Sequence, residues 1–279
     1  MSCWKRFTGS TEGGFDPTFR LETSWLLSPF ILAVLRGLLS LYAFVTLFFI
    51  FGWNGTHGMS ENSERSFSYF THLTYWGLAF YFLFSAIHTW TYSRSGIPLL
   101  ARWPRFLQIA HRMFHSTIVI YPWIVTIVYW ALLYENGIFK NKFQIWTNTS
   151  QHALNSAFAL FEIVFPRTAP LPFVDIIPVI VILAMYLGLA YVTASTQGFW
   201  VYGFLDNTTN SSGKVAVYIV GILVAAIVVF LIVRYLIMLR VWVTEKKLGK
   251  TGKFASHGGA GYVGDAEKGL PLHNVSGKQ

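Results

Sequence analysis

Charged residues and cysteine are both scarce in this chain. Aspartate, glutamate, lysine and arginine make up only 12% of its 279 residues, whereas a typical soluble domain holds about 25%. The single cysteine, Cys3, excludes an intramolecular disulfide and any metal site built from two or four cysteines. The chain also lacks a Gly-x-Ser-x-Gly elbow, a His-Glu-x-x-His motif and a glycine-rich phosphate loop. Familiar signatures of serine hydrolases, zinc proteases and nucleotide-binding proteins are therefore missing.

Apolar and aromatic residues fill the chain instead. Hydrophobic residues make up 54% of it and aromatic residues 18%. The main apolar segments cover residues 30–53, 69–92, 115–134, 152–165, 173–195 and 215–233. A membrane-spanning helix needs about 20 apolar residues, so we expect the short, partly polar fourth helix to begin further back, toward Trp146. The sequence predicts an all-α fold, a polytopic membrane helical bundle with about six transmembrane helices.

Basic residues indicate how the bundle is oriented. The connection 93–112 holds four arginines and no acidic residue, and more lysines and arginines follow the last apolar segment. Because positively charged loops stay in the cytosol, both termini are predicted to be cytosolic. The expected divisions are a cytosolic N-terminal segment (1–29), a six-span membrane domain (30–240) and a disordered cytosolic tail (241–279). Spans of about 20 residues suit either the endoplasmic reticulum or the plasma membrane.

The formal net charge of +9 raises the question of a nucleic-acid partner. The basic residues lie beside apolar segments, where they set orientation or meet anionic lipid headgroups, so we expect no nucleic acid. Arg36 is different, because it lies inside the first apolar segment. Its position near the cytosolic end predicts a side chain that snorkels toward the headgroups.

Two polar side chains open different apolar segments on the same side of the membrane. Thr71 opens the second segment and His152 the fourth. A threonine hydroxyl is a weak nucleophile that needs a base, and a buried neutral imidazole can take its proton. Helical spacing puts Thr74 beside Thr71, and Asn148 and Asn155 beside His152, where Asn148 can hydrogen-bond the ring. The residues suggest Thr71 and His152 as a catalytic pair, with Thr74, Asn148 and Asn155 in support.

Each of these residues also has an ordinary interpretation. A membrane threonine usually bonds a carbonyl of its own helix. His72, His88, His115 and His152 lie on three segments, and paired membrane histidines can hold haem iron. His111 and His115 have a metal-binding spacing, although their place at a basic helix end favours an interfacial pair. The residues alone leave a hydrolase, a haem redox protein and a non-enzymatic membrane organiser all open.

Three blocks carry a resemblance to a known family. They are Tyr69-Phe70-Thr71, the spacing Trp146-x-Asn148-x-x-x-His152, and the block 197–205, Gln-Gly-Phe-Trp-Val-Tyr-Gly-Phe-Leu. Over about residues 30–240 the chain resembles the family of the androgen-induced gene 1 and androgen-dependent TFPI-regulating proteins. The rolling-stone family of membrane proteins shows a similar second-segment pattern, which implies a membrane organiser.

The first resemblance implies an intramembrane threonine hydrolase. Its substrates would be fatty-acid esters of hydroxy fatty acids, which are membrane lipids. Thr71 matches the nucleophile and His152 the second catalytic residue. Such an enzyme is expected to need no metal and no cofactor.

Overall fold

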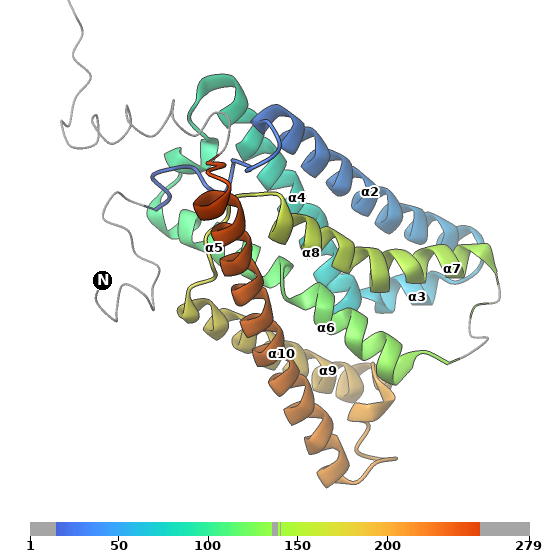
Figure 1. Ribbon diagram of the computed structural model, residues 1–279. Helices are drawn as coiled ribbons and strands as arrows, with labels where there is room; N and C mark the ends of the chain where they lie inside the picture. The colour runs from blue at the N-terminus through green and yellow to red at the C-terminus, as the bar shows by residue number, and fades with distance from the viewer. Residues whose placement is uncertain (1–14, 136–138, 140, 252–279) are drawn as a thin grey trace, which may run out of the picture.

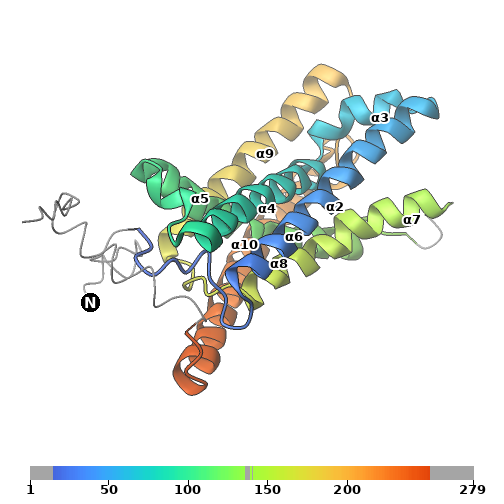
Figure 2. The same ribbon diagram turned by 90° about the horizontal axis from the view of Figure 1, so that it is seen from above.

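A computed structural model describes residues 15–135, 139 and 141–251, and these residues form helices and no β-strand (Figure 1). The main helices are α2 (Pro29–Thr56), α4 (Phe70–Ser95), α5 (Arg105–Ile118), α6 (Tyr121–Val128), α7 (Lys142–Thr149), α8 (Asn155–Val164), α9 (Ile176–Gln197) and α10 (Ser212–Val241). A short helix, α3 (Ser60–Glu64), follows α2. Figure 2 shows that α2, α4 and the consecutive helices α7 and α8 run in similar directions.

Four of these elements are long and apolar enough to cross a membrane. They are residues 29–56, 105–133, 173–197 and 212–247. The 26-residue α4 is more polar but packs along the length of α2. One apolar core joins α6, α9 and α10, and a second joins α2 and α4. The chain is therefore an all-α, multi-pass membrane bundle, while the count of six spans and the cytosolic termini stay predictions.

Local sequence signals explain where the helices begin and end. Pro29 suits the first turn of α2, and the Ser28 hydroxyl caps that turn by accepting a hydrogen bond from the Ile31 amide at 3.3 Å. Gly96 ends α4 in the left-handed conformation, with φ of 72°, which glycine adopts without strain. The final helix continues past the predicted boundary at residue 240, through a π-helical turn that ends at Lys247.

The third and fourth apolar segments differ from the continuous helices expected. The third breaks at residues 119–120, between α5 and α6, because Pro122 has no amide hydrogen and its ring collides with the carbonyl of the preceding turn. The fourth begins at Lys142, before Trp146 as expected, and Asn141 caps it by accepting from the Gln144 amide at 2.9 Å. A π-helical turn, Ser150–Leu154, then separates α7 from α8.

Arg36 does not snorkel, so that prediction is wrong. Its guanidinium is buried and donates to both carboxylate oxygens of Glu162 on α8, each at 2.8 Å. It also donates to the Thr89 hydroxyl at 2.6 Å and the Leu21 carbonyl at 2.9 Å. Tyr81 donates to the same carboxylate at 3.2 Å. The Arg36 charge is therefore neutralised inside the bundle by the Glu162 carboxylate and not by lipid headgroups, and this ion pair joins α2 to α8.

The expected interfacial pair, His111 and His115, packs inside the bundle, and its depth in the membrane stays a prediction. Both rings are buried, with exposed fractions of 6% and 2%. Helix α5 turns this face toward α4, where His111 stacks on Tyr81 and meets the edge of His88 at a centroid distance of 5.0 Å. Among the described residues, no three His, Cys, Asp or Glu side chains are arranged to hold a metal ion.

Candidate functional site

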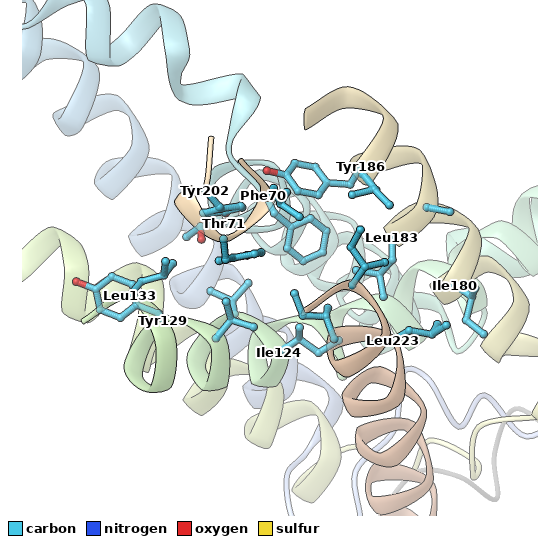
Figure 3. A pocket seen from close by; sticks show the side chains of 18 residues that line it. Phe70, Thr71, Ile124, Tyr129, Leu133, Ile180, Leu183, Tyr186, Tyr202 and Leu223 are labelled. Carbon is cyan, nitrogen blue, oxygen red and sulfur yellow. The ribbon is translucent and has the colours of Figure 1, made fainter. Parts of the chain in front are cut away.

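An apolar cavity of about 200 Å³ contains Thr71 in its wall (Figure 3). Its sides come from the start of α4, from α6, α9 and α10, and from the connection between the last two helices. The lining is aliphatic and aromatic, and four of its residues carry a hydroxyl: Thr71, Tyr129, Tyr186 and Tyr202. A cavity of this kind fits a hydrocarbon chain that presents one polar group near a hydroxyl.

Thr71 is the second residue of α4 and is half-buried. Figure 3 shows it beside Tyr202, across the cavity from Leu183 and Ile180. Burial raises the pKa of Tyr202, and hydrogen bonding with Thr71 and Tyr186 partly offsets that rise. Tyr202 therefore carries a neutral hydroxyl at physiological pH, which can donate a hydrogen bond next to the threonine oxygen.

The connection after α9 brings Tyr202 to this place. Gly198 ends α9 with φ of 73°, and the chain turns back toward the start of α4. Aromatic packing then fixes the ring, because it stacks on Phe204 at 5.2 Å and meets Tyr69 edge-on at 6.0 Å. Tyr202 lies in the sequence block 197–205, so the family resemblance marked its neighbourhood without assigning it a role.

His152 lies in the π-helical turn and is 8% exposed. Its Nδ1 is 3.1 Å from the Asn148 carbonyl. A carbonyl oxygen can only accept, so Nδ1 carries the proton and Nε2 keeps its lone pair. Asn148 thus sets the tautomer, as expected, but with its backbone rather than its side chain. π-Helical turns often occur at functional sites.

Tyr129 connects the histidine to the cavity. Its ring stacks on the His152 ring with centroids 3.6 Å apart and planes 16° apart. Its hydroxyl donates to the Asn148 side-chain oxygen at 3.0 Å, and the ring also lines the cavity that contains Thr71. Nothing in the sequence distinguishes Tyr129 from the other aromatic residues of its apolar segment.

Thr71 and His152 therefore lie on elements that meet, with Tyr129 in contact with the cavity and the imidazole alike. Helix α4 contacts the π-helical turn that carries His152. No hydrogen bond joins Thr71 to His152 within the part of the chain that the structure describes. His152 is also not among the described residues of the cavity wall. Catalytic contacts are often long in a ligand-free site and shorten when substrate binds.

The other two predicted supporting residues bond elsewhere. The Thr74 hydroxyl donates to the Phe70 carbonyl at 2.9 Å and to the Thr71 carbonyl at 3.1 Å, within its own helix. The Asn155 side chain accepts from the Thr126 hydroxyl at 3.2 Å and donates to a carbonyl of α6 at 3.3 Å. Thr74 therefore stabilises the first turn of α4, and Asn155 joins α8 to α6.

Comparison with known proteins gives a match to a protein family. A family model described as FAR-17a/AIG1-like protein matches residues 32–236, which is more than half of the chain. The matched region runs from α2 to α10 and includes Thr71, His152 and Tyr202. No curated protein and no solved structure matches the chain.

Proposed function

On the premise that the chain belongs to the FAR-17a/AIG1-like protein family, we propose that it hydrolyses lipid esters within the membrane. This membership confirms the predicted resemblance to the androgen-induced gene 1 family. Thr71 is the nucleophile and His152 the general base. The main support is the position of the Thr71 hydroxyl in an apolar cavity, beside a neutral phenol. The family resemblance makes fatty-acid esters of hydroxy fatty acids the expected substrates.

Acylation begins with the threonine. His152 Nε2 takes the hydroxyl proton, directly or through one water, as the threonine oxygen attacks the ester carbonyl carbon. The tetrahedral intermediate then collapses and expels the alcohol, which takes the proton back from the imidazolium. The products of this step are the free hydroxy acid and an acyl-threonine.

Water completes the cycle. His152 removes a proton from a water molecule, the resulting oxygen attacks the acyl-threonine, and the fatty acid leaves as the threonine regains its proton. Both tetrahedral intermediates place negative charge on the former carbonyl oxygen. The neutral Tyr202 hydroxyl is the donor we assign to that oxygen, since it already lies beside Thr71.

The cavity distinguishes acyl chains by their shape more than by their hydrophobicity. A lipid chain that leaves the bilayer for this cavity moves from one apolar medium to another, so the hydrophobic effect contributes little to its binding. Recognition therefore depends on packing against α6, α9 and α10, and on hydrogen bonds to the ester.

The test compares Thr71→Ala and His152→Ala with two matched variants, Thr196→Ala and His57→Ala. The last two change exposed residues, and neither lines the cavity. Turnover of a fatty-acid ester and labelling by an acyl-directed probe are measured in purified protein. Loss of the base is expected to lower the rate about 10²–10⁴-fold, and loss of the hydroxyl to abolish labelling.

Full turnover in either active-site variant would contradict the assignment. A membrane organiser would show no labelling in the wild type and unchanged cellular function in Thr71→Ala. A haem protein would instead show a Soret band in its absorption spectrum.

A further inference from the structure

A second cavity, of about 180 Å³, lies at the opposite end of α4 from Thr71. Its wall comes from residues 15–22, from the connection after α4 and from the start of α5, and it shares no described residue with the first cavity. The 26 residues of α4 separate the two ends by roughly 39 Å, at about 1.5 Å per residue. This end carries the four arginines of residues 93–112, which span the end of α4 and the start of α5.

A buried carboxyl group with one unpaired oxygen faces this second cavity. Glu22 is 2% exposed, and its Oε1 accepts no hydrogen bond from any described residue. Burial raises the pKa of Glu22 to about 8, with a further rise from Asp16 and a smaller, opposite effect from Arg36. Tyr92 also faces Glu22. Buried polar atoms are nearly always hydrogen-bonded, so Oε1 indicates a donor that a ligand supplies.

Positive charge is available in the same wall. Arg105 lines the cavity, and its guanidinium lies over the Phe15 ring at 5.3 Å. Gln108 joins two parts of the cavity wall, because its side chain on α5 donates to the Leu100 and Ala101 carbonyls at 3.2 and 3.3 Å. One cavity thus presents a buried, unpaired carboxyl oxygen and an exposed arginine, which suits a ligand that carries a hydrogen-bond donor beside an anionic group.

We propose that this cavity binds the headgroup of a membrane phospholipid that carries a primary amine and a phosphate. The ammonium donates to Glu22 Oε1, and Arg105 faces the phosphate. A quaternary ammonium has no hydrogen to donate and leaves Oε1 unsatisfied, so the site prefers ethanolamine over choline headgroups. The cavity lies at the first residue of the candidate membrane span 105–133. Lipid headgroups surround the ends of such spans, and this favours a lipid over a water-soluble ligand.

The experiment titrates purified full-length protein in detergent with phosphatidylethanolamine, phosphatidylcholine or phosphatidylglycerol and counts bound lipids by intact-complex mass spectrometry. The wild type is expected to retain the ethanolamine lipid about tenfold better than the choline lipid, because a charge-assisted hydrogen bond is lost in the latter. Equal retention of these two lipids overturns the proposal without any variant.

Two variants test the two groups. Glu22→Leu, which removes the accepting oxygen, is expected to abolish the preference for ethanolamine, and Arg105→Gln to weaken ethanolamine and choline lipids alike. Arg102 is exposed, lies in the connection between α4 and α5 and does not line the cavity, so Arg102→Gln is the control and keeps the preference. An unchanged preference in a folded Glu22→Leu protein overturns the site.

Two further measurements separate lipid binding at this site from capture of a water-soluble ligand and from the hydrolase activity. Displacement of the lipid by soluble O-phosphoethanolamine at equal concentration would overturn the lipid as the source of the headgroup. Thr71→Ala must keep the preference, so failure of the proposed hydrolase and failure of this site give different results.

Discussion

Arg36→Met is expected to be the most destabilising single substitution among the charged residues of the bundle. Arg36 and Glu162 are 1% and 0% exposed, and two hydrogen bonds of 2.8 Å join them. Removal of one partner leaves a buried charge uncompensated, which typically costs about 3–5 kcal/mol. The Leu21 carbonyl loses its donor as well, for about 1 kcal/mol. The folded-to-unfolded ratio should fall at least a hundredfold.

The double variant Arg36→Met/Glu162→Gln tests the cause of that loss. Glutamine is neutral and still offers an oxygen to the Tyr81 hydroxyl, so the unpaired charge disappears while that hydrogen bond remains. Most of the stability should return, since replacing a buried ion pair by neutral groups is often close to neutral. Unfolding in mixed micelles of dodecyl sulfate and a mild detergent, followed by tryptophan fluorescence, measures each variant.

An exposed ion pair supplies the matched control. Arg65 pairs with Glu61 in the helical turn before α4, and their side chains are 39% and 67% exposed. Arg65→Met is expected to change the stability by less than about 1 kcal/mol. An Arg36→Met protein that unfolds at the same detergent composition as the wild type would refute the role of the buried pair. A double variant less stable than the single one would refute it as well.

Two further predictions concern the two cavities. Tyr202→Phe keeps the ring packing but removes the proposed oxyanion donor, so kcat for ester hydrolysis should fall about 10²–10³-fold with little change in KM; an unchanged kcat refutes the role of Tyr202. Glu22 has a raised pKa of about 8 against an ordinary value of 4.5, so the folded state holds its proton more tightly, and stability should decrease as pH rises from about 4.5 to 8. Thermal melting across that range should show a shallower decrease in Glu22→Gln.

Part of the candidate site is visible in the sequence and part is not. Thr71 and His152 stand out because they are polar side chains at membrane depth with apolar neighbours. Tyr129 and Tyr202 do not, because aromatic residues are common throughout this chain. Their importance depends on which ring lies against His152 and which hydroxyl lies beside Thr71. The sequence places these contacts on separate helices or connections, and only packing joins them.

The sequence by itself determined the class of the protein. Hydrophobicity is a property of each residue, so the apolar segments predict membrane helices wherever they later pack, and the residue spacing within the blocks identifies the family. The tertiary structure alone decided that Arg36 meets Glu162 and that α5 turns its histidines inward, toward α4. These contacts depend on which faces of distant helices touch, and helical periodicity places residues on a face without naming the helix opposite it.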